Sequence, residues 1–200
     1  MKTIAYNRVQ KILYGSMKKD PFIIDVPAMN YLCFEGMGHP SEPDYQLSCE
    51  TLYTLSYILK FDIARKQLDA DYKVNPMEVS WLLDKSGNGI KFTWTMMIMQ
   101  PDIITESHVH EAVRIAAEKG KAVASERVFF QNISFGRCVQ CAHRGDYNLM
   151  NDTLAKMKAF AYENSLASDQ YTHDIYLNDM RKTRVENYKT IMRIKTEPLL

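Results

Sequence analysis

The chain has 200 residues, of which 46% are hydrophobic and 24% charged, so it can bury a core and is not a disordered sequence. The formal net charge is +1 and the Lys and Arg residues are spread along the chain, which excludes the basic stripe that a nucleic-acid-binding surface needs. Apolar runs such as residues 94–99 are too short to span a bilayer, and no signal-type stretch follows the amino terminus, so we expect a cytoplasmic protein.

The first half of the chain predicts strands around one helix. Residues 1–21 are interpreted as a polar lead segment that ends at Pro21. Within the helix, Tyr53 and Tyr57 are four residues apart and therefore lie together on one flank. Ser86-Gly87-Asn88-Gly89 predicts a hairpin turn. The predicted strands and helix are, in order, residues 22–26, 30–35, 41–60 (the helix), 78–83 and 90–99.

The second half repeats this order after a linking helix. Thr105 predicts the cap of that helix, which runs over about residues 105–120. The elements that follow are strands at residues 126–131 and 135–143, a helix containing Met150, Leu154, Met157 and Ala161, and strands at 171–177 and 188–195. Strand–helix–strand–strand therefore occurs twice, over about residues 22–99 and 126–195. The pattern predicts an α+β fold in which an antiparallel sheet carries helices on one face. The other face needs a lid, a partner or a ligand.

The four cysteines indicate neither a disulfide framework nor a metal site. They stand at positions 33, 49, 138 and 141 without a secretory signal, so we expect reduced thiols. Cys138 and Cys141 form a C-x-x-C inside a predicted strand, where residues three apart point to opposite faces. No second C-x-x-C completes a zinc site. We expect no bound metal and no cofactor.

Flat and adaptable apolar side chains are abundant. The sequence has 12 Tyr, 12 Met, eight Phe and two Trp. Methionine fills irregular gaps and aromatic rings make flat walls, so this bias fits a methionine-rich core. It fits equally well a cleft that receives planar ligands of varied shape. Both interpretations remain open at this stage.

Several segments, in their order and spacing, resemble a known family. They are Val26-Pro27-Ala28-Met29, Glu35-Gly36-Met37-Gly38, Leu52-Tyr53-Thr54-Leu55-Ser56-Tyr57, Pro76-Met77-Glu78-Val79-Ser80-Trp81, residues 91–101, residues 138–147 and residues 173–183. Over about residues 20–195 the chain resembles the stand-alone GyrI-like small-molecule-binding proteins.

The resemblance implies a duplicated strand–helix–strand–strand module with pseudo-twofold symmetry, forming a single domain over residues 22–200. It also implies a cleft between the halves that holds planar, often cationic, compounds against aromatic walls and a buried acid. Some relatives are effector domains of transcription regulators. Residues 1–21 are too short for a helix-turn-helix, so we do not expect a regulator. Others are hydrolases that open the cyclopropane ring of DNA-alkylating natural products.

The chain departs from the family pattern at three positions. Asp174 stands where the family usually has Glu in His-Glu-Ile-Tyr-Leu, and the shorter side chain retracts the carboxyl by one methylene. Asp146 and Met180 replace prolines at turn positions. The first departure bears on the chemistry of the site, and the other two concern turns.

Candidate site residues follow from the resemblance and from strand alternation. Asp174 and Tyr176 share a face, and we expect the aliphatic neighbours on the other face to meet the helices. Glu78 and Trp81 can both line the cleft only if a bulge intervenes, which we favour. The expected catalytic residues are Glu78, Asp174 and Tyr176. The expected ligand-binding residues are Phe34, Tyr53, Tyr57, Trp81, Trp94, Met96, His143 and Tyr147, although Trp94 fits a core stripe equally well and His143 alone would more often be structural.

The expected function is binding of planar aromatic, in some cases cationic, small molecules. For an enzyme, the implied reaction is addition of water to a strained cyclopropane, with Glu78 as the first candidate base, Asp174 as the second and a tyrosine hydroxyl as donor. The alternative is a protein that sequesters drugs or toxins without turnover. A third interpretation, a module that presents an open sheet face to another protein, has less support. No nucleic acid or membrane is expected as a partner.

Overall fold

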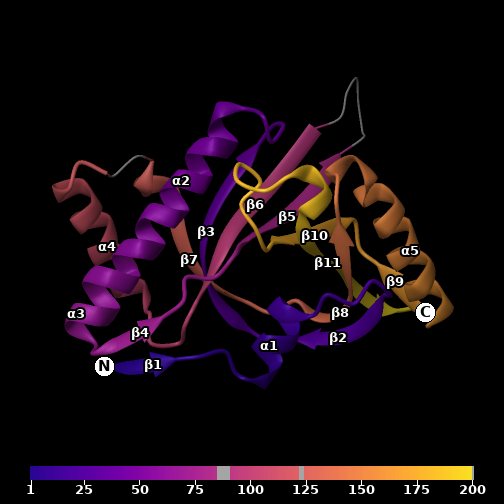
Figure 1. The fold of residues 1–200 in the computed structure, drawn as a ribbon, viewed down its shortest axis with the longest axis horizontal. Coiled ribbons are helices and arrows are strands. Elements are labelled where there is room, and N and C mark those ends of the chain that lie inside the picture. The colour runs from indigo at the N-terminus through magenta and orange to yellow at the C-terminus, as the bar shows by residue number, and fades with distance from the viewer. Residues whose placement is uncertain (85–90, 122–123, 200) are drawn as a thin grey trace. The chain divides into compact units, whose positions relative to one another are not determined.

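The computed structural model describes residues 1–84, 91–121 and 124–199. The chain divides into two compact units, and each unit is assembled from separated stretches of sequence (Figure 1). Unit 1 comprises Met1–Ala5, Met29–Met77 and Asp84–Ile133, and unit 2 comprises Tyr6–Ala28, Glu78–Leu83 and Ser134–Leu200. The expected hairpin turn at residues 86–89 lies outside the described residues. No helix among the described residues is long and apolar enough to cross a membrane.

Unit 1 is organised around a central antiparallel strand. β3 (Met29–Met37) pairs with β6 (Lys91–Gln100) on one side and with β7 (Val128–Ile133) on the other. Four consecutive β3 side chains, from Tyr31 to Phe34, have no exposed surface. Consecutive residues on a strand point to opposite faces, so both faces of β3 are covered.

The helices of unit 1 pack on this sheet and on each other. The first helix starts at Pro43, where proline is tolerated because its missing N–H would have no helical partner. After this helix the backbone continues as a π-helical segment and then as one further α-helical turn. The elements are α2 (Pro43–Ile58), η1 (Leu59–Ala64), α3 (Arg65–Gln67) and α4 (Glu106–Glu118), with a short parallel pair of β1 (Lys2–Ile4) and β4 (Ala70–Tyr72).

Unit 2 has its own strand order, β2-β8-β11-β10-β5, with β9 pairing β11. The strand pairs β2·β8, β8·β11, β11·β10 and β11·β9 are all antiparallel. The strands are β2 (Phe22–Val26), β5 (Met77–Asp84), β8 (Gly136–Arg144), β9 (Leu166–Ser168), β10 (Tyr171–Tyr176) and β11 (Lys189–Pro198).

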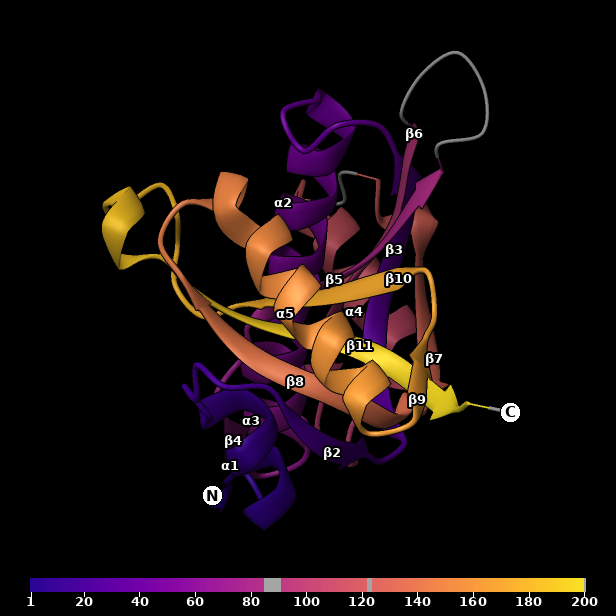
Figure 2. The same cartoon turned by 90° about the vertical axis from the view of Figure 1, so that its right-hand side faces the viewer.

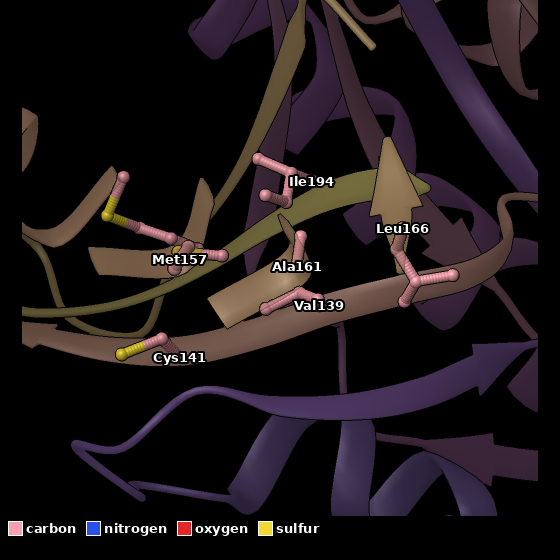
Figure 3. Close-up of a cluster of buried hydrophobic side chains, with 7 residues drawn as sticks. Val139, Cys141, Met157, Ala161, Leu166 and Ile194 are labelled. Carbon is pink, nitrogen blue, oxygen red and sulfur yellow. The ribbon is translucent and has the colours of Figure 1, made fainter. Parts of the chain in front are cut away.

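One face of the unit 2 sheet is covered by α5 (Met150–Glu163), which lies along β8 and β11 (Figure 2). Apolar side chains of the helix, of β8 and β11, and of Leu166 at the start of the next strand form a buried cluster (Figure 3). Full burial of a side chain of this kind contributes about 1.5–3 kcal/mol, so the cluster fixes the helix on this face. Its members are Val139, Cys141, Met157, Ala161, Leu166, Met192 and Ile194.

The opposite face of the same sheet carries α1 (Arg8–Gly15), because Gln140 and Arg193, which alternate with the strand residues of that cluster, donate to the carbonyls of Ile12 and Leu13. This helix starts at a capping box in which Asn7 and Gln10 exchange hydrogen bonds of 2.8 and 3.0 Å. Leu13 and Tyr14 are buried. Residues 1–21 are therefore part of the fold and not the lead segment expected from sequence. The capping pair Asn7–Gln10 was the signal that could have revealed the helix.

The α+β class and the antiparallel pairing agree with the sequence prediction, and its longer elements lie within a few residues of their expected places. The composition of the two units differs from the contiguous halves 22–99 and 126–195. β2 pairs with β8, and β3 pairs with β7, so each unit takes strands from both halves of the chain. Periodicity identifies strands but carries no information on which distant strand becomes the neighbour. The expected pseudo-twofold remains a prediction.

Candidate functional site

The expected site residues divide between the two units. The expected acids all belong to unit 2, so this unit by itself contains a candidate site. Unit 2 holds Glu78, Trp81, His143, Tyr147, Asp174 and Tyr176, whereas unit 1 holds Phe34, Tyr53, Tyr57, Trp94 and Met96.

Asp174 is a buried acid with an unused oxygen. It lies on β10 opposite Met192 of β11, and its relative exposure is 5%. Its Oδ1 atom has no hydrogen-bond partner among the residues that the structure describes. Burial raises the pKa of the Asp174 carboxyl to about 7, and a hydrogen bond from the Trp81 side chain acts in the opposite direction. Near neutral pH this group can therefore accept a proton or pair with a cation.

Half-buried tyrosines gather on the same part of unit 2. The Tyr147 ring meets that of Tyr176 edge-on at 5.7 Å and stacks on that of Tyr188 at 4.9 Å. Burial raises the pKa of the Tyr147 hydroxyl, with a smaller contribution from the Asp174 charge. The rings are partly exposed, so a planar molecule can contact them while one of their edges stays packed. Together with Trp81, these residues provide flat walls beside an acid.

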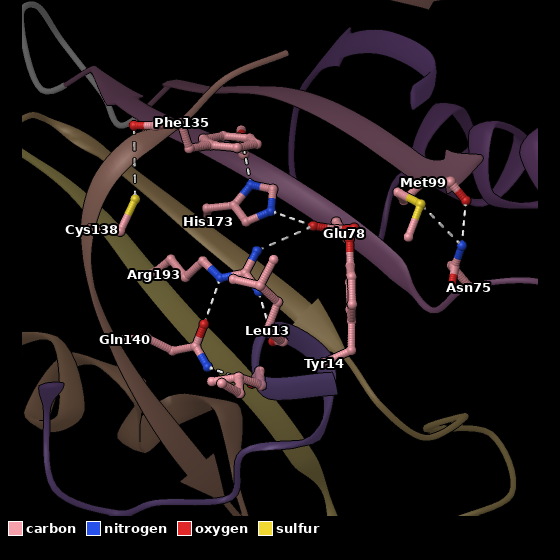
Figure 4. A network of polar contacts seen from close by, with 12 residues as sticks. Leu13, Tyr14, Asn75, Glu78, Met99, Phe135, Cys138, Gln140, His173 and Arg193 are labelled. Carbon is pink, nitrogen blue, oxygen red and sulfur yellow. Dashed lines mark hydrogen bonds and ion pairs between the residues drawn. The ribbon is translucent and has the colours of Figure 1, made fainter. Parts of the chain in front are cut away.

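Glu78 has a different environment, because it is fully buried and both of its oxygens are used (Figure 4). Tyr14 Oη donates to Oε1 at 2.6 Å, and His173 Nε2 lies 2.7 Å from Oε2. Arg193 Nη1 lies 3.7 Å from Oε2 and supplies the compensating charge. Ser80 Oγ lies 2.8 Å from the second ring nitrogen of His173. We call these five residues the Glu78 cluster.

Glu78 and Trp81 lie on opposite faces of β5, so the bulge favoured from sequence is wrong. Glu78 and Ser80 both contact His173, whereas Trp81 bonds to Asp174, the next residue on β10. Regular strand alternation explains this arrangement without an extra residue. The expected orientation of Asp174 also needs correction. Asp174 shares the α5 face with Met192, and the opposite face carries the Glu78 cluster and α1.

Three of the aromatic and methionine candidates in unit 1 are core residues. Phe34, Trp94 and Met96 have relative exposures of 0, 1 and 0%. The Trp94 ring stacks on Phe34 at 6.5 Å, and its Nε1 atom donates to the Gly38 carbonyl at 3.3 Å. A Cβ at Gly36 would come within 2.2 Å of the Trp94 ring, so glycine is required for this packing. Their burial favours the core interpretation.

Tyr53 and Tyr57 lie on one flank of α2, as predicted. Their rings stack at 6.4 Å, and Tyr57 also stacks on Phe61 at 6.0 Å. Tyr57 is 48% exposed. This aromatic ladder is accessible, but it belongs to unit 1 and contains no acid of the candidate site.

His143 has a structural environment. Its Nδ1 atom lies 2.8 Å from Thr153 Oγ1 and its Nε2 atom lies 3.0 Å from the Asp146 carbonyl oxygen. Both ring nitrogens are therefore engaged in joining β8 to the start of α5. His143 also borders a shallow pocket of about 360 Å³ that includes Lys19 and Lys156. Among the described residues, no group of His, Cys, Asp and Glu side chains could hold a metal ion.

Sequence reasoning missed four residues around the two acids: Tyr14, His173, Arg193 and Tyr188. One signal was available. Arg193 is a lone charge within the apolar run Ile191-Met192-Arg193-Ile194, and a buried charge requires a partner of opposite sign. The partner, Glu78, lies on a different strand, which only the fold reveals.

Comparisons with known proteins identify the family to which this fold belongs. No protein of curated function matches the sequence. A conserved Listeria innocua protein of uncharacterized function has a similar structure, with 32% identity, coverage of 94% of this chain and 97% of that chain, and a TM-score of 0.87. Two structures of a hydrolase from Listeria innocua are also similar. One has 32% identity, 94% and 96% coverage and a TM-score of 0.84, and the other has 31% identity, 92% and 95% coverage and a TM-score of 0.84.

A family model matches nearly the whole chain. Residues 19–196 match the GyrI-like small molecule binding domain. The match spans both units, and it includes Glu78, Trp81, Asp174, Tyr147, Tyr176 and Tyr188. On these grounds the chain belongs to the family of GyrI-like small molecule binding domains.

Proposed function

We propose that this protein binds planar aromatic, preferably cationic, small molecules beside Asp174 and hydrolyses those that carry a strained cyclopropane ring. The family supports small-molecule binding, and two of the three similar Listeria innocua structures are those of hydrolases. The walls in this proposal are Trp81, Tyr147 and Tyr176, and the working acid is Asp174.

The observation that carries the proposal is the unused oxygen of Asp174. A buried carboxyl group normally has its hydrogen bonds satisfied, because an unpartnered one loses the stabilisation that water gave it. Asp174 Oδ1 lacks a partner among the described residues, and burial holds the pKa of the group at about 7. Such a group gains more from a cation or a water molecule than an exposed carboxylate does. Glu78, the first candidate from sequence, lacks this property because both of its oxygens are occupied.

The proposed chemistry is addition of water. The Asp174 carboxylate takes a proton from water while the water oxygen bonds to a cyclopropane carbon. The ring C–C bond breaks and its electron pair moves into a conjugated carbonyl, whose oxygen receives a proton from the Tyr176 hydroxyl. Asp174 then returns its proton to Tyr176, so the product is a ring-opened alcohol. General-base help of this kind contributes about 10² to 10⁴ in rate.

A sequestering protein without turnover is the second candidate function. The same observation favours it, because an ionised Asp174 among aromatic rings is also a site for an organic cation. In that case the acid is an electrostatic partner and no bond is made or broken. Affinity alone does not separate the two candidates, so the test has to detect product.

The test is incubation of the purified protein with a cyclopropane-bearing DNA alkylator, followed by mass spectrometry for the water adduct. We expect an adduct whose rate falls by about 10² or more in Asp174→Asn, while affinity for a neutral planar compound stays within a few-fold. An equal rate in Asp174→Asn would contradict the role of Asp174. Absence of the adduct with the unaltered protein, together with binding of cationic dyes, would leave the sequestering function.

A further inference from the structure

We infer that Glu78 is a positioning residue, which acts from one face of the unit 2 sheet to hold the Trp81–Asp174 pair in place on the other face. The inference rests on the proposed function in one respect, namely that Asp174 is the working acid. It assigns to Glu78 a role that neither the chemistry of water addition nor the binding of a cation requires directly.

The Glu78 cluster joins four elements at one point (Figure 4). Tyr14 comes from α1, Glu78 and Ser80 from β5, His173 from β10 and Arg193 from β11. Arg193 extends the network, because its Nε atom donates to Gln140 at 2.7 Å and its Nη2 atom donates to the Leu13 carbonyl at 2.7 Å. A displacement of β5 against β10 would therefore break contacts in all four elements.

The link to the other face is short. His173 is adjacent to Asp174 on β10, and Ser80 is adjacent to Trp81 on β5. The two ring nitrogens of His173 contact two side chains of β5, at 2.7 Å and 2.8 Å. These two contacts set the position of β10 relative to β5 along and across the strands. The same relative position decides whether Trp81 can donate to Asp174, because that bond spans the same two strands.

The cluster requires a carboxylate at position 78. Tyr14 donates to one oxygen and His173 donates to the other through Nε2–H, while Arg193 Nη1, 3.7 Å from Oε2, supplies a counter-charge without a hydrogen bond. Burial lowers the pKa of His173, and the bond to Glu78 opposes this shift, so a neutral ring that accepts from Ser80 fits the geometry. A glutamine has a single acceptor oxygen. Its amide N–H group would face one of the donors, and Arg193 would lose its counter-charge.

The test uses the indole N–H resonances in ¹H–¹⁵N NMR spectra. The chain has two tryptophans, and Trp94 donates to Gly38 in unit 1, so its signal serves as an internal reference for an intact fold. The Trp81 signal is assigned by its loss in Trp81→Phe. With the unaltered protein we expect the Trp81 signal to titrate with a midpoint near pH 7 while the Trp94 signal stays constant, and we expect the Trp81 titration to vanish in Asp174→Asn.

In Glu78→Gln we expect the amplitude of the Trp81 titration to fall by at least half and the rate of water addition to fall with little change in KM. Glu50→Gln, at an exposed position on α2, is the matched control and should leave the Trp81 titration unchanged. An unchanged Trp81 titration in a folded Glu78→Gln protein would overturn the positioning role. A titration that survives Asp174→Asn would overturn both this inference and the role of Asp174 in the proposed function.

Two milder variants keep the test decisive if Glu78→Gln does not fold. Tyr14→Phe removes one donor to Glu78 and keeps the ring, and Ser80→Ala removes the second contact of His173. We expect a smaller loss of Trp81 titration amplitude in each variant. Amplitudes equal to that of the unaltered protein in both variants would contradict the inference.

Discussion

Two buried acids of unit 2 lie on neighbouring strands, Glu78 on β5 and Asp174 on β10, and their surroundings differ. Glu78 faces α1, has no exposed surface, and receives hydrogen bonds on both oxygens with an arginine nearby. Asp174 faces α5, is almost as deeply buried, and has one oxygen without a partner among the described residues. Burial alone therefore does not distinguish Glu78 from Asp174, the acid that we propose as the working group. The distinction lies in how many of the carboxyl oxygens the protein itself satisfies.

The largest effect that tests this difference between the two acids is expected at Glu78. Glu78→Gln leaves Arg193 buried without its counter-charge, so we expect the free energy of unfolding to fall by about 3–5 kcal/mol. Chemical denaturation followed by circular dichroism measures this change. The exposed control Glu50→Gln should shift the free energy of unfolding by less than about 0.5 kcal/mol. Equal stability of the two variants would mean that Glu78 is not the electrostatic centre of its cluster.

Asp174→Asn should change the free energy of unfolding in the opposite direction, towards greater stability. The pKa of Asp174 is about 7 in the folded protein against 3.8 for the free group, a difference of about 3 units. This group therefore makes the folded protein progressively less stable as pH rises from about 4 to about 7, by up to roughly 4 kcal/mol. We expect Asp174→Asn to be more stable than the unaltered protein at pH 8, by about 2–4 kcal/mol, and the gain to disappear near pH 4. Thermal or urea unfolding at the two pH values checks this prediction.

Binding of a cationic planar dye should report the ionisation of Asp174 directly. With a pKa of about 7, roughly a tenth of the carboxyl groups are ionised at pH 6 and roughly nine tenths at pH 8. We expect affinity to rise about tenfold over this range, as measured by fluorescence titration. A neutral dye of similar shape is the control and should bind equally at both pH values. A constant affinity for the cation would place it away from Asp174.

The smallest expected effect is on the affinity for a planar dye when Tyr188, which stacks on Tyr147, is replaced. Tyr188 stacks on Tyr147, while its hydroxyl donates to the Met180 carbonyl in an exposed turn at 3.1 Å. We expect Tyr188→Ala to weaken binding of a planar dye about three- to tenfold, because the stacked ring is lost. Tyr188→Phe keeps the ring and should stay within about twofold. If both variants bind equally well, Tyr188 does not support the ligand-facing ring of Tyr147.

Periodicity and turn chemistry were enough to predict the α+β class and the longer strands and helices. They also placed Asp174 and Tyr176 on one face, because the alternation along residues 171–177 is regular. The sequence could not identify the pairing of β2 with β8 or of β3 with β7, since long-range pairing depends on the packed fold. β9, with three residues, is shorter than the windows in which alternation can be recognised.

The ranking of the two acids could not be predicted for a related reason. The choice between Glu78 and Asp174 depends on Tyr14, His173 and Arg193, which lie 64, 95 and 115 residues from Glu78 along the chain. An acid on a strand is compatible with both roles until its hydrogen-bond donors are known. The bulge at β5 was expected so that Glu78 could share a face with Trp81, and the structure removes that need because Asp174 occupies the place next to Trp81.

The span of the Glu78 cluster along the chain has a consequence for biosynthesis. Arg193 bonds to the Leu13 carbonyl across 180 residues, so the cluster cannot close on the ribosome until β11 has emerged. Until then Glu78 keeps its hydration, and β5 has no charged partner to hold it against β10. Contacts of such long range form late and slow the folding of a domain. Variants that weaken the cluster should therefore lower the yield of newly made, correctly folded protein more than their equilibrium stability alone would indicate.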